Sequence, residues 1–226
     1  MISQDAEKVI NKVMDKIKEK NLKVKSVIVF GSAVRKGHFK PGTSDVDVVL
    51  IVDRLEDVSV ENFKDVDGSL ELGVLTSGQF LEMYFNGDPL AHMIWLEGQA
   101  VYDDGFFEQI KFKSRPKVTE LTIMKLRYWG FKNLVNALRA KDPKDHLRSL
   151  HHAVRNFARL KVAREKALLA ITDEELLELL DRSLSVKYRR FLDKVAGHEG
   201  YSEQLVREAI ELIEQLDGKS HCNFLA

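Results

Sequence analysis

Apolar residues recur at two spacings along the chain, and the pattern changes near residue 118. Before that point, short runs rich in β-branched residues alternate with stretches of helical periodicity, which predicts strands and helices in turn. After it, apolar residues recur at helical spacing only. The predicted strands cover residues 24–30, 46–52, 70–75 and 100–102. The sequence therefore predicts an α+β half followed by an all-helical bundle.

Residues that favour helix ends bound the predicted helices. Thr76 and Thr172 each precede a Gln or Glu by three positions, the spacing of a capping box. Asp88 followed by Pro89 is typical of a cap and a first helical residue. The predicted helices cover 3–20, a segment after 76, a segment from 89 to near 98, 120–141, 143–166, a segment after 172, 186–196 and 202–217. We expect one domain over 1–115 and a helical one over 116–226.

Composition narrows the classes of function. Lys+Arg and Asp+Glu both number 35, so the formal net charge is zero, whereas proteins that coat long nucleic acid carry a basic excess. The single cysteine, Cys222, excludes an intrachain disulfide and a cysteine-rich zinc site. No apolar run approaches the roughly 20 residues of a membrane span, and the N-terminus lacks the features of a signal peptide. We expect a cytoplasmic protein without membrane or long nucleic-acid partners, whose oligomeric state the sequence leaves open.

The residues from Gly31 to Asp47 include groups that could bind a phosphate and a metal ion. Gly31 lets the backbone approach a ligand closely, and Ser32 offers a hydroxyl and an N–H directly after a strand. Asp45 and Asp47 are two positions apart, so both project to one face of an extended chain. Two such carboxylates repel each other unless a cation neutralises them, and oxygen ligands suit Mg²⁺ bridging substrate phosphates. The stretch predicts a phosphate cradle beside a metal site.

The pattern Gly-Ser, a gapped loop and then Ser-Asp-x-Asp before an apolar strand resembles the signature of the polymerase-beta nucleotidyltransferase superfamily. The resemblance covers about residues 24–102. It implies an α+β fold with a mixed sheet and flanking helices. It also implies transfer of a nucleoside monophosphate from an NTP to a hydroxyl acceptor, with release of pyrophosphate. The sequence names neither the acceptor nor the base.

The resemblance also implies roles for individual residues. Asp45 and Asp47 would hold Mg²⁺ or Mn²⁺, and Glu71, where the family commonly has aspartate, matches a third catalytic carboxylate on a later strand. Asp65 and Asp67 are rivals for that third position, but they precede the strand in a loop. The positions matched to nucleotide contacts are Gly31, Ser32, Arg35, Lys36 and Ser44.

Two alternative functions stay open at this point. The same fold could bind nucleotide without turnover, as a regulatory or antitoxin-like module, and the status of Glu71 discriminates that reading from catalysis. An RNA-end nucleotidyltransferase is the other alternative. The neutral charge counts against it, and a continuous basic groove would count for it.

The helical half contains one polar stripe. Arg148, His152, Arg155 and Arg159 share a face of the predicted helix over 143–166. They could form an acceptor-side wall of a cleft, but the interpretation we favour is a solvated face.

Overall fold

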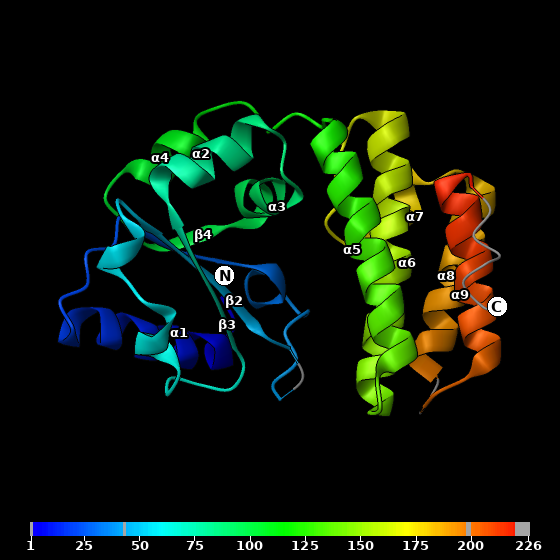
Figure 1. Cartoon of the computed structure of the whole chain (residues 1–226), viewed down its shortest axis with the longest axis horizontal. Helices are drawn as coiled ribbons and strands as arrows, with labels where there is room; N and C mark the ends of the chain where they lie inside the picture. Colours follow the sequence, from blue (N-terminus) through cyan, green and yellow to red (C-terminus); the bar gives the residue numbers. More distant parts are fainter. Residues whose placement is uncertain (1, 43, 198–199, 220–226) are drawn as a thin grey trace. The chain divides into compact units, whose positions relative to one another are not determined.

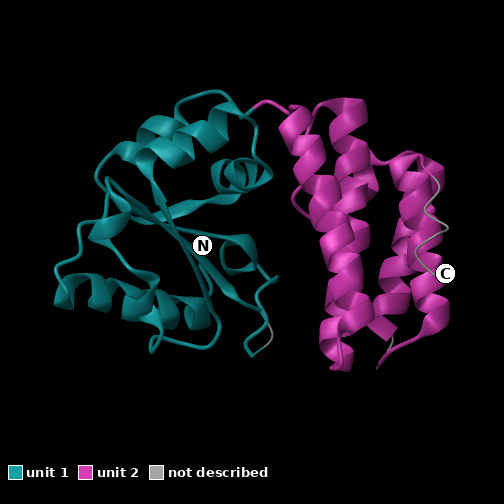
Figure 2. Cartoon of the chain, in the orientation of Figure 1, with its two compact units in different colours: residues 1–116 teal, residues 117–226 magenta. Residues whose placement is uncertain are grey.

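The structure is a computed structural model that describes residues 2–42, 44–197 and 200–219. The chain divides into two compact units, residues 1–116 and residues 117–226 (Figure 2). Cys222 lies outside the described residues.

The first unit is built on a four-stranded mixed sheet in the order β3-β2-β1-β4 (Figure 1). The strands are β1 Ser26–Phe30, β2 Val46–Val52, β3 Leu70–Thr76 and β4 Gln99–Asp103. β1 pairs antiparallel with β2 and β4, whereas β2 and β3 are parallel. This confirms the predicted fold class. It also brings the end of β1 and the starts of the other three strands to the same end of the sheet.

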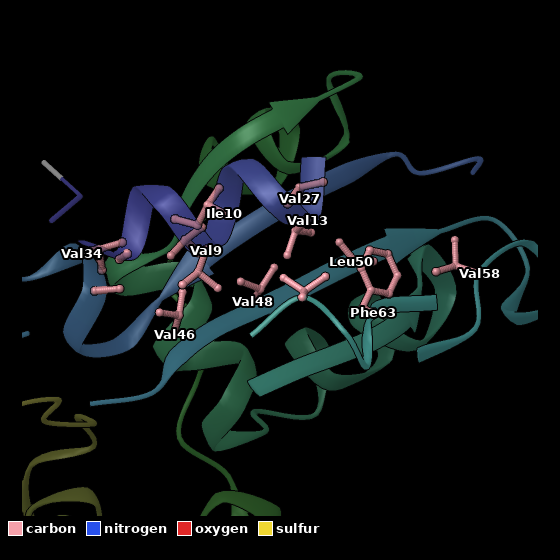
Figure 3. Close-up of a cluster of buried hydrophobic side chains, with 14 of the residues drawn as sticks. Val9, Ile10, Val13, Val27, Val34, Val46, Val48, Leu50, Val58 and Phe63 are labelled. Atoms are coloured by element: carbon pink, nitrogen blue, oxygen red, sulfur yellow. The ribbon is translucent and has the colours of Figure 1, made fainter. Parts of the chain in front are cut away.

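Helix α1, Gln4–Glu19, covers one face of the sheet. It begins after Ser3, whose hydroxyl accepts from the backbone N–H of Ala6 at 3.3 Å. Apolar side chains from the helix pack on alternate residues of the strands, as the period of two requires (Figure 3). The core includes Val9, Ile10, Val13, Val27, Val46, Val48, Leu50 and Phe63. Residues 47, 49 and 51 of β2 therefore project to the opposite face.

Three helices cover that opposite face, namely α2 Ser77–Phe85, α3 Pro89–Glu97 and α4 Phe106–Lys111 (Figure 1). The predicted capping box of Thr76 with Gln79 is present, and Asp88 caps α3 with Pro89 as its first residue. The sequence pattern did not predict α4, whose six residues are too few to show a clear helical period. Short 3₁₀ turns, η1 Gly31–Val34, η2 Leu55–Asp57 and η3 Val60–Phe63, lie in the connections.

The second unit is all-helical in its described residues. Its helices are α5 Glu120–Arg139, α6 Pro143–Lys166, α7 Asp173–Leu179, α8 Arg182–Gly197 and α9 Glu203–Asp217. The capping box of Thr172 with Glu175 is confirmed. Helix α8 begins four residues before the predicted start at 186. No helix within the described residues has the length and apolar content needed to cross a membrane.

Helices α5 and α6 approach closely at Gly130, which provides a test of this packing. A Cβ at Gly130 would lie 2.5 Å from Cε2 of Phe157, a fully buried ring. We expect Gly130→Ala to lower the free energy of unfolding by about 1–3 kcal/mol, because the clash exceeds the gain in helix propensity. Gly78→Ala in α2, with only a 3.8 Å contact to Thr76, is the matched control and should be neutral or slightly stabilising. Thermal unfolding followed by circular dichroism measures both, and a higher Tm for Gly130→Ala would contradict this packing.

Candidate active site

The predicted acids come together at the end of the sheet where β2 and β3 begin. Asp47 and Glu71 are register partners on these parallel strands, so their side chains project to the same face. Glu71 is exposed, while its neighbours Leu70 and Leu72 pack toward the α1 core. Asp45 is the residue directly before β2, so the strand includes Asp47 but not Asp45. The strand parity expected for Glu71 is thus present in the structure.

The two rival acids are bonded to α1 instead. Asp65 accepts from Lys16 Nζ at 2.7 Å, and Asp67 accepts from Lys12 Nζ at 3.4 Å. Both lysines belong to α1, which covers the other face of the sheet. Of these three acids, Glu71 is the register partner of Asp47, so its role as the third carboxylate stays a prediction while the two rivals are bonded elsewhere.

Asp47 is in an environment that disfavours its charge. Burial, followed by the negative charges of Glu71, Asp45 and Glu97 in decreasing order, raises the pKa of the Asp47 carboxyl to about 7. Arg35 opposes them with its positive charge. Near neutral pH this environment therefore favours a proton on Asp47.

The acids are not a ready-made metal cage. Within the described part of the chain, no group of three or more His, Cys, Asp or Glu side chains is arranged to hold a metal ion. The metal role predicted for Asp45, Asp47 and Glu71 therefore stays a prediction. The donor set nevertheless fits a hard divalent cation, because carboxylate oxygens with excess negative charge are what Mg²⁺ and Mn²⁺ prefer.

The Asp47 carboxylate leaves no room for a side chain at position 31. Its φ is +73°, a left-handed conformation, and an added Cβ would lie 2.2 Å from Oδ2 of Asp47. Its N–H donates to Oε1 of Glu97 at 2.9 Å. Because Gly31 has no side chain, its backbone can lie close to the Asp47 carboxylate of β2. The Gly31 amide is hydrogen-bonded to the carboxylate of Glu97.

Glu97 is the residue of this cluster that the sequence pattern did not reveal. It is the last residue of α3, and its Oε2 pairs with Nε of Arg35 at 2.9 Å. Nε of Arg35 also donates to the carbonyl oxygen of Gly31 at 3.2 Å. In the sequence, Glu97 is marked only by its place three residues before the predicted edge strand. Its proximity to the glycine loop follows only when that strand, β4, is known to pair with β1.

The other predicted nucleotide contacts border the same loop. Ser32 is half-buried, and its hydroxyl donates weakly to the carbonyl of Asp45 at 3.5 Å. Ser44 closes the loop, because its hydroxyl accepts from Lys40 N at 2.9 Å and its N–H donates to Lys40 O at 2.8 Å. Lys36 is exposed. The structure thus brings together Gly31, Arg35 and the acids, and leaves Lys36 at the periphery.

The polar stripe of α6 is not a solvated face. Arg155 and Arg159 each donate from NH2 to the carbonyl of Ile171, at 2.7 and 2.6 Å. Burial, followed by the positive charge of a neighbouring histidine and of the arginines, lowers the pKa of His152 to about 3. Only Arg148 at the start of the stripe is exposed. The favoured interpretation is therefore wrong for Arg155 and Arg159, which bond the connection between α6 and α7.

Comparison with known proteins identifies a family for the part of the chain that contains the candidate active site. The family described as nucleotidyltransferase domain matches residues 10–145. Among solved structures, a nucleotidyltransferase-like protein from Exiguobacterium sibiricum 255-15 is 15% identical, with a TM-score of 0.40 over 92% of this chain and 74% of that one. That likeness is too weak to support an argument about function. No curated protein matches the sequence significantly.

The raised pKa of Asp47 predicts a pH-dependent stability in metal-free buffer. The folded protein retains this proton up to about pH 7, whereas the unfolded chain releases it near the ordinary value of 3.8. Unfolding then releases a proton between these values, so this group lowers stability as pH rises. Asp47→Asn lacks the effect, so its stability advantage over wild type should grow between pH 5 and 8, by on the order of 1–3 kcal/mol. Urea unfolding in EDTA measures the difference, and a flat difference would contradict the assigned pKa.

The contact between Gly31 and Asp47 predicts a specific glycine requirement. Gly31→Ala adds backbone strain of about 1–2 kcal/mol and a clash with the carboxylate. Gly37→Ala is the matched control, because its φ is +78° and nothing lies within 4 Å of the added Cβ. We expect Gly31→Ala to lower Tm clearly more than Gly37→Ala does, and the excess to shrink in an Asp47→Ala background. Equal effects of the two substitutions would mean that the Asp47 carboxylate does not lie against Gly31.

Proposed function

Because the chain belongs to the nucleotidyltransferase domain family, we propose that it moves a nucleoside monophosphate from an NTP to a hydroxyl acceptor in a metal-dependent reaction. The observation that supports this most is the register pairing of Asp47 with Glu71, with Asp45 two residues earlier. Folding places these like charges together although their repulsion is unfavourable. Such an arrangement is typical of a site that receives a cation with its substrate.

Mg²⁺ or Mn²⁺ is the cation that this donor set would take. Asp45, Asp47 and Glu71 would hold it, and phosphate oxygens of the NTP would complete the ligands that the protein does not preassemble. When bound, the ion supplies neutralisation of phosphate charge and lowers the pKa of the acceptor hydroxyl.

The chain's own residues divide the reaction between them. Glu71, which is exposed at the edge of the site, would accept the proton of the acceptor hydroxyl. The acceptor oxygen then bonds to the α-phosphorus, and the bond from that phosphorus to the bridging oxygen breaks, which releases pyrophosphate. Arg35, with Lys36 and the Ser32 hydroxyl, would stabilise the negative charge on the departing phosphates. Asp47 must be deprotonated for this, so activity should rise with pH toward 7.

A nucleotide-binding module without turnover is the alternative that the structure keeps open. The observation in its favour is that the described acids do not form a preassembled metal set. The two readings differ in what Glu71 does, because a binding module needs NTP affinity but no proton acceptor.

Metal-dependent binding of NTP is the first prediction of the proposed function. We expect calorimetry to show ATP or GTP binding in Mg²⁺ or Mn²⁺ and a loss of at least about 10-fold in affinity in EDTA, because the acids and the triphosphate repel each other. Asp47→Ala should abolish metal-dependent binding while Tm in EDTA is maintained or raised. Equal affinity with and without metal would contradict the proposal.

Turnover separates the enzyme from the binding module. Each labelled NTP is incubated with cell extract, and labelled products are sought, since the acceptor is unidentified. We expect Glu71→Gln to lower labelling on the order of 10²–10³-fold and to lower NTP affinity far less, because Asp45 and Asp47 would still hold the cation. Asp65→Asn, an acid-to-amide change on the α1 side, is the matched control and should label like wild type. Binding without any labelled product would favour the module.

A further inference from the structure

Glu97 contacts the backbone at the start of η1 and the side chain of Arg35, the residue that follows η1, at the same time. Its Oε1 accepts from Gly31 N–H, and its Oε2 pairs with Arg35 Nε, each at 2.9 Å. The side chain of Glu97 is 12% exposed and that of Arg35 is 22% exposed. A largely buried ion pair with both carboxylate oxygens engaged is more restrictive than a surface pair, because breaking it leaves an uncompensated charge.

The turn after α3 fixes where this carboxylate lies. Gly98 follows Glu97 directly, and a Cβ there would lie 2.3 Å from the carbonyl oxygen of Ile94 and 3.0 Å from Ile28 Cγ2. The chain therefore passes tightly from α3 into β4, whose first residue pairs with Val29 of β1. Glu97 is held by this turn beside the end of β1, where the η1 segment starts.

The contacts of Arg35 determine which way its charge points. Nε lies between the Glu97 carboxylate and the carbonyl oxygen of Gly31. The guanidinium carries five N–H donors and Nε supplies one of them, so the donors of NH1 and NH2 can bind a further anion. Among the described residues, the side-chain hydrogen bond and the ion pair of Arg35 both use Nε. Arg35 is also linked to the acids by geometry, because its Nε donates to the carbonyl of Gly31, and Gly31 lies directly against the Asp47 carboxylate.

We propose that Glu97 is a positioning residue that holds the guanidinium of Arg35 so that its NH1 and NH2 fork receives the β- and γ-phosphates of an NTP. The identity of the ligand rests on the proposed function, whereas the fixing of Arg35 by Glu97 does not. The opposite role is that the Glu97 carboxylate occupies the place of a phosphate and is displaced by it. The two roles predict effects of opposite sign on triphosphate affinity.

The first test needs no nucleotide. Hydrogen exchange of the Gly31 amide and of the Arg35 Nε–H is measured by NMR in wild type, Glu97→Ala, Glu97→Gln and the control Glu82→Gln, an exposed glutamate of α2. We expect exchange at both sites to accelerate by about 10-fold or more in Glu97→Ala, because both hydrogen bonds are lost. Glu97→Gln should keep the Gly31 amide protected, since its side-chain carbonyl still accepts. Wild-type exchange rates in Glu97→Ala would overturn the positioning role.

The second test compares a nucleoside triphosphate with the monophosphate, both with Mg²⁺, by calorimetry. We expect Glu97→Ala to weaken triphosphate binding about 10–100-fold, the worth of a charge-assisted arginine–phosphate contact, and to leave monophosphate binding within about 2-fold. Arg35→Ala should behave similarly, and the double variant should be no weaker than Arg35→Ala alone. A merely structural role of Glu97 would weaken both ligands alike.

The remaining outcomes are equally decisive. Tighter triphosphate binding by Glu97→Ala would show that its carboxylate blocks the site, which overturns the positioning role. Failure of the wild type to bind any triphosphate would overturn the proposed function and the ligand assigned to Arg35. In that case the exchange rates still show whether Glu97 fixes Arg35, so the two failures are distinguishable.

Discussion

The parallel pairing of β2 with β3 is the constraint on which the candidate active site depends. It sets Asp47 opposite Glu71 on one face of the sheet, at the end where both strands begin. The α1 core on one face and the α2–α4 core on the other hold the strands in that register. Strand pairing keeps the two residues adjacent, so the repulsion between their carboxylates lowers the stability of the first unit.

Two acids, the buried Asp217 and the half-buried Asp47, have opposite electrostatic surroundings. In the helical unit, Asp217 accepts from Arg127 NH2 at 2.7 Å and from Arg164 NH1 at 3.0 Å, so the protein supplies two positive charges for one buried carboxylate. Around Asp47 the balance is reversed, because Arg35 is paired with a further acid of the same cluster. The first arrangement joins helices. The second arrangement has more negative than positive charge around Asp47, which is the charge balance that the proposed metal-bound nucleotide would neutralise.

Local signals in the sequence account for most of the secondary structure. Capping boxes at Thr76 and Thr172 and the Asp88-Pro89 start were predicted and are present, because a cap is an interaction within four residues. The short helix α4 was missed, and the α6 stripe was misread. Helical spacing shows that Arg155 and Arg159 share a face, but it cannot show that Ile171 returns to accept from both. A polar face that packs on a loop has the same periodicity as a solvated one.

The sequence by itself determined the fold class, the strands of the first unit and the two aspartates beside the glycine loop. These follow from patterns over a few consecutive residues, and the family resemblance rests on the same stretch. Only the tertiary structure decided that Glu71 is the register partner of Asp47, that Gly31 makes room for the Asp47 carboxylate, and that Glu97 bonds the loop. Each of these contacts joins segments separated along the chain. Strand register and the path from α3 into β4 set them, and both are fixed by packing of the whole sheet.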